Sequence, residues 1–403
     1  MRKIHQAFLA LLRSGIRGEK PEDPALSPEA WEELLRLAFD QQILPLIFDT
    51  ACSLPSFRQM DRGIYRKQRE LAVKIAVREM VQTNEFLSFY AAAQKEGLRA
   101  IVLKGIVCRS LYPQPCLRPS MDEDLLIPEG EMEAWHRYLT AQGLSSDDPE
   151  GTGERSYHKP NSPTYLELHG TLFPESSSAY GDLNELFEGA WDRAEPLQAE
   201  DVSLLTLSPT DHLLYLLCHA YKHFLHSGIG MRHVADIGLF ALRYHDRIDG
   251  QRLYRVCEEK KIQYFCAALF RIAEEELGIS AGLSPFEALE ADPGPMLADI
   301  LTDGLYGADD PDRIHSSNIT LEAVAARRQG RAGNGFWKSL FPGKAYLKKR
   351  FPYAAKHPWL LPAAWTHRVW LYLAGGETNA SRSLQIGRER IELLKEYRII
   401  PRQ

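Results

Sequence analysis

Residues 102–127 read VLKGIVCRSLYPQPCLRPSMDEDLLI, and the rest of the chain is organised around this stretch. An apolar run ends at Lys104-Gly105, a short helical pattern follows, and a proline-rich loop leads to Asp122-Glu-Asp124 and a second apolar run. Alternate residues of a β-strand point to the same face, so Asp122 and Asp124 are expected side by side. The stretch therefore predicts a strand, a glycine turn, a short helix and an acidic strand.

The two aspartates suggest a cation site. Two adjacent carboxylates repel each other, and holding both ionised is costly unless a cation neutralises them. Mg²⁺ prefers oxygen ligands and usually takes one or two carboxylates together with substrate phosphates. An acidic strand end in solvent has the same local sequence. Asp122 and Asp124 are therefore predicted to hold Mg²⁺ (or Mn²⁺), with a solvent-exposed strand end as the alternative.

A later strand offers a third carboxylate. Residues 164–169 read TYLELH, an alternation that places the two leucines on one face and Tyr165, Glu167 and His169 on the other. Glu167 is predicted to join the metal site because the aspartate pair precedes it. Without that pair, Glu167 would be an ordinary solvent-facing acid on a half-buried strand.

Three residues near the aspartates are predicted to bind a nucleotide. Lys104 could reach a phosphate as a point charge, or be a solvated lysine at a turn. Gly105 allows close approach of the backbone to a phosphate, or an unusual turn conformation. Arg118 could bind a triphosphate with two hydrogen bonds, or pair with the carboxylates.

These motifs resemble those of the uncharacterised bacterial nucleotidyltransferase family of the polymerase-β-like superfold. LKG, LYP, RPSMDEDLL and YLELH carry the resemblance, which continues through HLLYLLCHAYKHF, RHVADIGLF and SLFPGKAYLKKRFP over most of residues 65–375. It implies a two-metal nucleotidyl-transfer site in which Gly105 forms the turn, Asp122 and Asp124 lie on the next strand, and Glu167 is the third acid.

Two positions depart from the pattern of that superfold. Its common Gly-Ser is Gly105-Ile106 here, so a hydroxyl contact to phosphate is missing. Glu123 stands where an apolar residue would be usual.

The resemblance implies a reaction in which a nucleoside monophosphate moves from an NTP, such as ATP, to an unidentified acceptor with release of pyrophosphate. The acceptor could be a small molecule, a peptide, a protein or RNA. Two alternatives stay open. One is a non-catalytic member of the same fold that binds a nucleotide or a protein, and the other is a phosphotransferase that moves the γ-phosphoryl group.

Four regions are expected along the chain: an N-terminal helical region (1–97), a nucleotidyltransferase catalytic core (98–207), a helical region bordering the cleft (208–280), and a linker with a C-terminal helical region (281–403). The core alternates strands with helices, and its Ser-, Asp-, Gly- and Pro-rich residues 145–163 predict a hairpin or loop. The expected fold is α+β (mixed α/β), with a small catalytic sheet surrounded by a large helical portion.

A long helix is expected over about residues 64–96, ending at Gly97. Apolar residues recur in it at helical spacing, namely Val73, Ala76, Val77, Met80 and Leu87. We expect this stripe to pack against the catalytic sheet, as core or as a lid.

A helix opening near Ser208 carries four histidines on one broad face: His212, His219, His223 and His226. His219 and His223 have the spacing of zinc ligands, but HAYKH lacks the glutamate of a zinc-protease helix. Packing or hydrogen bonding is favoured over zinc, and the resemblance places His219 and His223 at the border of a possible cleft. Arg232 and Asp236, four residues apart on the next helix, are expected to form an ion pair.

Composition bounds the class of protein. The 403 residues are 44% hydrophobic and 25% charged, which is ordinary for a soluble globular chain. The net charge of -6 argues against a general nucleic-acid-binding surface. Six cysteines without a Cys-x-x-Cys pair predict reduced thiols in a cytoplasmic protein. The sequence has no uninterrupted run of about 18 apolar residues, so no membrane span is predicted.

Two charged segments lie late in the chain. Residues 309–312 form an acidic run that predicts a solvated loop. Residues 338–350 hold basic side chains interleaved with aromatic ones, which favours a surface amphipathic helix over an edge that binds the acceptor.

Overall fold

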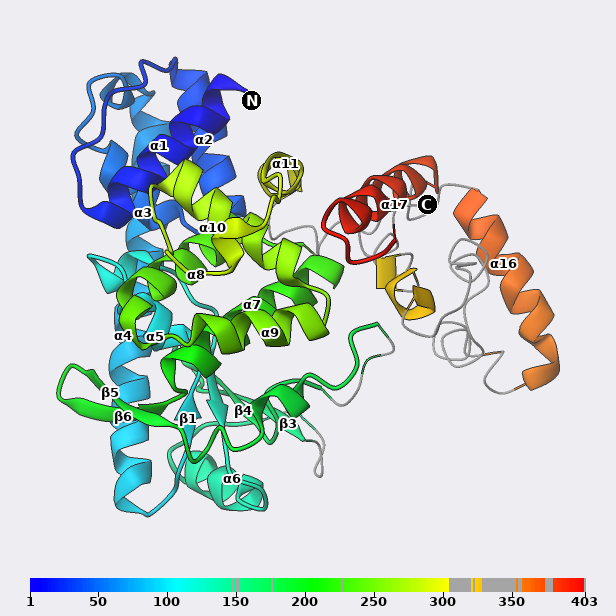
Figure 1. Cartoon of the computed structure of the whole chain (residues 1–403). Coiled ribbons are helices and arrows are strands. Elements are labelled where there is room, and N and C mark those ends of the chain that lie inside the picture. The colour runs from blue at the N-terminus through cyan, green and yellow to red at the C-terminus, as the bar shows by residue number, and fades with distance from the viewer. Residues whose placement is uncertain are drawn as a thin grey trace.

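The computed structural model describes residues 1–146, 148, 153–174, 177, 179–226, 228–303, 320–321, 323–327, 353, 357–373 and 380–401. The acidic run 309–312 and the basic segment 338–350 lie outside these residues. Figure 1 shows a small sheet with helices on its sides and above it. The predicted α+β fold, with a small sheet in a large helical surround, is confirmed.

The sheet has six strands in the order β3-β4-β2-β1-β6-β5. The β2–β4 and β1–β6 pairs are parallel, and the other neighbours are antiparallel. The strands are β1 (Ile101–Val102), β2 (Glu123–Leu126), β3 (Glu154–His158), β4 (Tyr165–His169), β5 (Glu195–Ala199) and β6 (Val202–Thr206). The two short strands β1 and β2, which flank the glycine turn, thus occupy the middle of the sheet.

The edge strand β3 falls within residues 145–163, for which the sequence predicted a hairpin or a loop. It pairs antiparallel with β4 over five residue pairs, so the hairpin is what forms there. Its burial alternates, with Arg155 and Tyr157 inside. The Arg155 guanidinium is matched by Glu133 at 2.6 Å, which explains how an arginine occupies an inward position.

The first three helices pack together at one end of the molecule: α1 (Lys3–Arg17), α2 (Pro28–Asp40) and α3 (Leu44–Ala51). Helix α2 begins as the sequence predicts, with Pro28 in its first turn and the Ser27 hydroxyl accepting a hydrogen bond from the Ala30 amide at 3.3 Å. Its apolar stripe, which includes Trp31 and Leu34, is fully buried.

Helix α4 (Arg62–Lys95) runs from the N-terminal helices past the sheet (Figure 1). The expectation that its whole apolar stripe packs inward is wrong. Val73, Val77 and Met80 are 50%, 51% and 52% exposed, whereas Leu87, nearer the sheet, is buried. Near its middle the helix instead turns polar Glu79 inward, toward the buried Arg109, which lies 3.6 Å away.

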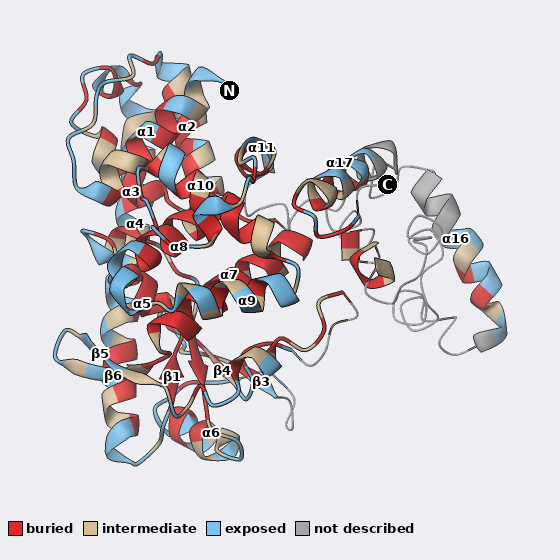
Figure 2. Ribbon diagram, viewed as in Figure 1, coloured by how far each residue is buried: buried red, intermediate tan, exposed pale blue. Residues whose placement is uncertain are grey.

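Four helices lie between the N-terminal helices and the sheet, as Figure 1 shows: α7 (Pro209–His226), α8 (Met231–Arg243), α9 (Gly250–Glu259) and α10 (Gln263–Leu277). Most residues of α7, α8 and α10 are buried, whereas α9 buries Leu253 and Cys257 and exposes much of its surface (Figure 2). Further α-helices among the described residues are α5 (Lys104–Arg109), α6 (Met132–Ala141), α11 (Gly294–Asp303), α16 (Leu361–Leu373) and α17 (Ala380–Glu396). In the part of the chain that is described, no helix has the length and apolar character needed to cross a membrane.

Candidate functional site

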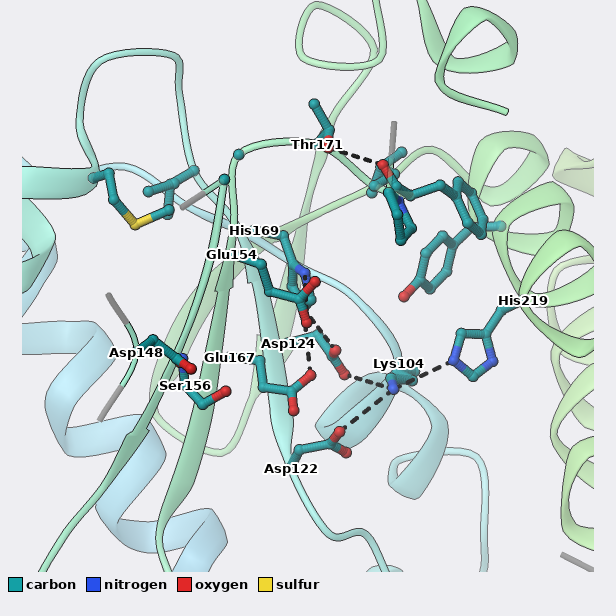
Figure 3. A pocket seen from close by; sticks show the side chains of 18 of the residues that line it. Lys104, Asp122, Asp124, Asp148, Glu154, Ser156, Glu167, His169, Thr171 and His219 are labelled. Atoms are coloured by element: carbon teal, nitrogen blue, oxygen red, sulfur yellow. Dashed lines mark hydrogen bonds and ion pairs between the residues drawn. The ribbon is translucent and has the colours of Figure 1, made fainter. Parts of the chain in front are cut away.

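Polar side chains from β2, β4, α5 and α7 converge on a cavity of about 1110 Å³ (Figure 3). Asp124 on β2 is in register with Glu167 on the neighbouring parallel strand β4. Asp122, one residue before β2, lines the same cavity. The structure therefore brings together the three carboxylates that the sequence singled out.

Lys104 lies between the two aspartates. Its Nζ is 3.6 Å from Asp122 Oδ2 and 3.1 Å from Asp124 Oδ2. Burial by itself would lower the pKa of Lys104, but the charges of Asp124 and Asp122 outweigh it and raise that pKa. The lysine is therefore a half-buried counter-ion of Asp122 and Asp124, and its interpretation as a solvated turn residue is wrong.

His169 is a site residue that the sequence placed on the correct face without giving it a role. Its Nε2 donates to Asp124 Oδ1 at 3.0 Å and lies 3.6 Å from Glu167 Oε2. The alternation of TYLELH, which puts His169 beside Glu167, was the signal that could have identified it. With Lys104 and His169 on its two oxygens, Asp124 has a donor or cation on each side.

The two neighbouring carboxyl groups have opposite pKa shifts. Burial opposes ionisation of Asp124, but Lys104 and the His169 hydrogen bond outweigh it and lower the pKa to about 2. Burial and the negative charges of Asp124 and Asp122 raise the pKa of Glu167 to about 7. The cavity thus holds one firmly ionised carboxylate beside one that carries its proton near neutral pH.

The donor set fits a divalent cation. Asp124, Glu167 and His169 each offer one ligand atom, and these atoms lie within 4.8 Å of one another. Asp124 Oδ2 is buried and accepts no well-directed hydrogen bond, although the Lys104 ammonium lies beside it. Carboxylate oxygens suit Mg²⁺ and Mn²⁺, and an imidazole nitrogen widens the choice toward later transition metals.

The Lys104-Gly105 turn requires its glycine. Gly105 has φ +29°, and a Cβ there would lie 2.1 Å from Glu123 Oε2. The same oxygen accepts a hydrogen bond from the Ile106 amide at 3.0 Å, and Glu123 is ion-paired with Arg109. Arg109 in turn lies 3.6 Å from Glu79 of α4. The buried side chain of Glu123 thus supports the turn that carries Lys104.

Arg118 pairs with α8 rather than with the acid pair. Its guanidinium contacts Asp236 at 3.2 and 2.5 Å, and the Tyr112 hydroxyl donates to the same carboxylate at 2.9 Å. Arg232 instead donates to the Pro119 carbonyl at 2.6 Å. Two expectations are therefore wrong: Arg118 does not brace Asp122 and Asp124, and Asp236 takes Arg118 rather than Arg232 as its partner. A nucleotide contact for Arg118 stays a prediction.

His219 and His223 of α7 line the cavity beside Lys104. His219 Nε2 is 3.4 Å from Lys104 Nζ and 3.2 Å from His223 Nε2. Burial, followed by the charge of Lys104, lowers the pKa of His223 to about 3 and that of His219 well below its ordinary value. His212, in contrast, is fully buried, stacks on Phe240 and contacts Thr206.

The family model described as uncharacterised nucleotidyltransferase matches residues 27–278. This range holds all six strands and helices α2 to α10, and it ends before the late motif at 339–352 that the sequence resemblance included. The search of curated proteins found no match. Since the matched range covers more than half of the sequence and contains the whole acidic cavity, the chain belongs to the uncharacterised nucleotidyltransferase family.

Proposed function

We propose that this chain is a metal-dependent nucleotidyltransferase that moves a nucleoside monophosphate from an NTP to an acceptor and releases pyrophosphate. The observation that carries the proposal is the register of Asp124 and Glu167 on adjacent parallel strands, with Asp122 and His169 beside them. Membership of the nucleotidyltransferase family supports the reaction class. The three carboxylates Asp122, Asp124 and Glu167, called the acid cluster from here on, support the requirement for a cation.

Asp122, Asp124 and Glu167 are the proposed ligands of Mg²⁺ or Mn²⁺, and His169 holds Asp124 in place. A bound divalent cation stabilises negative charge at the reacting phosphate and lowers the pKa of the attacking group. Glu167 is the proposed acceptor of the proton from the nucleophile, because the aspartate pair is committed to the cation and Glu167 lies in register with Asp124. Lys104 is the proposed partner of a nucleotide phosphate.

The cavity is large enough for two reactants. Its volume of about 1110 Å³ lies above the range of about 300–1,000 Å³ typical of sites for one small ligand. A nucleotide and part of an acceptor can therefore occupy it together, whether the acceptor is a small molecule or one end of a peptide, protein or RNA. A cytoplasmic location is part of the proposal, in keeping with six free cysteines.

The test is incubation with each α-labelled NTP, Mg²⁺ or Mn²⁺, and a cell extract. A labelled acceptor together with pyrophosphate is the expected result. In a parallel incubation with γ-labelled NTP, a labelled acceptor with NDP as product would identify a phosphotransferase, and no transfer from any NTP would overturn the enzyme proposal.

The matched variants are Asp124→Asn and Glu129→Gln. Asp124→Asn should abolish transfer, because a neutral amide is a poor ligand for a hard cation. Glu129 lines the same cavity but is exposed, so Glu129→Gln should leave transfer unchanged. Melting temperatures of both variants separate loss of activity from loss of folding. Full activity in folded Asp124→Asn would contradict the proposed role of the acid cluster.

A further inference from the structure

A second, smaller cavity adjoins the acid cluster on the side of α8. It has a volume of about 240 Å³, and Lys104, Asp122, His219 and His223 line both cavities. This volume is below the range of about 300–1,000 Å³ for drug-sized ligands, yet several times the roughly 30 Å³ of a water molecule. The smaller cavity therefore suits a compact group rather than a whole nucleotide.

The lining of the smaller cavity is rich in cations. Lys104, Arg118 and Arg232 line it against the two carboxylates of Asp122 and Asp236. Arg118 is 3% exposed, and its Nη1 has no hydrogen-bond partner. Arg232 Nε also has none. These two atoms are covered by protein, as are unpaired guanidinium nitrogens of other arginines in the described chain. The three cationic side chains that line the cavity are therefore what indicates an anionic ligand.

Both guanidinium groups are held in place before any ligand arrives. Asp236 fixes Arg118 with two contacts, and the Pro119 carbonyl fixes Arg232 at 2.6 Å. Groups that are already ordered lose little conformational entropy when a ligand binds. Planar arginine forks match the geometry of phosphate oxygens better than a flexible ammonium does.

Three histidines complete the lining without adding charge. The rings of His219 and His223 are 4.4 Å apart, and His233 of α8 lies 6.0 and 5.6 Å from them. Burial and the neighbouring cations lower the pKa of all three. Neutral imidazoles can each donate one hydrogen bond to an oxygen of an anion.

We propose that the smaller cavity is the subsite for the terminal phosphates of the NTP, with Arg232 and Arg118 as its recognition residues. The identity of the anion rests on the proposed function, whereas the cation-lined cavity does not. Lys104, on the boundary of the two cavities, contacts the phosphate chain where it passes from one to the other. Neither Arg232 nor His233 belongs to the acid cluster.

The subsite accounts for the fate of the leaving group. The nucleophile of the acceptor forms a bond to the α-phosphorus, and the bond from that phosphorus to the oxygen bridging to the β-phosphate breaks. The electron pair of the broken bond stays on that oxygen, so pyrophosphate leaves into the smaller cavity. The proton of the nucleophile passes to Glu167.

The experiment is calorimetric titration of the full chain, in chelator and low salt, with inorganic tripolyphosphate. Arg232→Gln should weaken binding about tenfold or more, the effect of a charge-assisted hydrogen bond. Arg243→Gln is the matched control, because Arg243 is exposed at the end of the same helix, α8. This variant should bind tripolyphosphate with the affinity of the wild type. Wild-type affinity in Arg232→Gln, or absence of binding to the wild type, would overturn the subsite.

A second measurement does not depend on how the variant folds. In the wild-type protein, tripolyphosphate should shift the NMR signals of the rings of His219, His223 and His233, but not that of exposed His245. Equal shifts at His245, or none at the three cavity rings, would refute the placement. Tripolyphosphate binding without transfer from any NTP would keep the subsite and remove the proposed function. Nucleotidyl transfer without tripolyphosphate binding would keep the proposed function and remove the subsite.

Discussion

Asp124 and Glu167 lie side by side on neighbouring strands, yet folding shifts their pKa values in opposite directions. Asp124 gains a cation and a hydrogen-bond donor on folding, which holds its pKa near 2. Glu167 becomes buried beside two negative charges, which raise its pKa to about 7 from an ordinary value of 4.5. Folding thus makes Asp124 a stronger acid and Glu167 a weaker one.

The raised pKa of Glu167 sets the pH dependence of stability in the absence of metal. Between pH 4.5 and about 7 the folded protein binds this proton and the unfolded chain does not. The contribution of Glu167 to the free energy of unfolding is therefore full below pH 4.5 and is lost as the pH rises through that window. Gln cannot ionise, so the free energy of unfolding of Glu167→Gln should exceed that of the wild type by about 1 to 2 kcal/mol at pH 8 and by little at pH 5.

Urea denaturation in chelator at the two pH values measures this difference. Glu129→Gln is the control, since an exposed carboxylate at the cavity rim should change stability equally little at both. A gain for Glu167→Gln of the same size at pH 5 and pH 8 would contradict the ionisation argument.

Local sequence predicted the acidic residues of the site but not their partners. The alternation of a strand is a property of neighbouring residues, so the sequence alone places Asp122, Asp124 and Glu167 on one side of the sheet. The contact of Lys104 with the aspartates depends on a left-handed glycine and on burial from distant elements. His169 reaches Asp124 because β4 lies beside β2. The order of the strands in the sheet cannot be predicted from the six residues TYLELH alone.

At the scale of elements, helix α4 shows what the spacing of apolar residues can and cannot predict. The spacing of its apolar residues predicted a long helix, and the helix forms over the expected residues. The pattern could not show which face would be buried upstream of Leu87. There Glu79 faces inward, 3.6 Å from Arg109, and the apolar stripe of Val73, Val77 and Met80 stays exposed.

Two alanine substitutions on α4 should therefore differ sharply. Leu87→Ala, at a buried position near the sheet, should lower the free energy of unfolding by about 2 to 5 kcal/mol. Val77→Ala, at a position that is 51% exposed, should change it by about 0.5 kcal/mol or less, since alanine also favours the helix more than valine does. Chemical denaturation measures both, and a loss above about 2 kcal/mol for Val77→Ala would show that its side chain is covered.

At the scale of the whole molecule, elements beyond the matched range 27–278 are built into the core. Helix α1 buries Phe8 and packs on α3 and α10. After α17, Tyr397 is 1% exposed, and its hydroxyl donates to the Asp292 carbonyl at 2.8 Å and accepts from the Met296 amide at 3.0 Å. Helix α1 thus packs on the matched range, and the segment after α17 holds the residues at the start of α11.

Tyr397→Phe tests this docking. The change removes one hydroxyl and leaves the buried Met296 amide without its acceptor, which should cost about 1 to 3 kcal/mol of unfolding free energy. Tyr254→Phe is the matched control, because its hydroxyl contacts only the surface residue Glu258, at 3.3 Å. Equal stability of the two variants in urea would mean that the segment after α17 contributes little to the fold.

The ion pairs of the site join residues that are far apart in the sequence, so the two members of each pair are translated at different times on the ribosome. Lys104 is translated 18 residues before Asp122, so the acid pair has a counter-ion within the nascent chain from the start. Arg118 precedes Asp236 by 118 residues, a delay of about 6 to 24 s at ordinary rates of elongation. The proposed phosphate subsite is therefore the last part of the catalytic region whose residues are all translated, whereas the lysine that faces the acidic strand is in the chain before that strand.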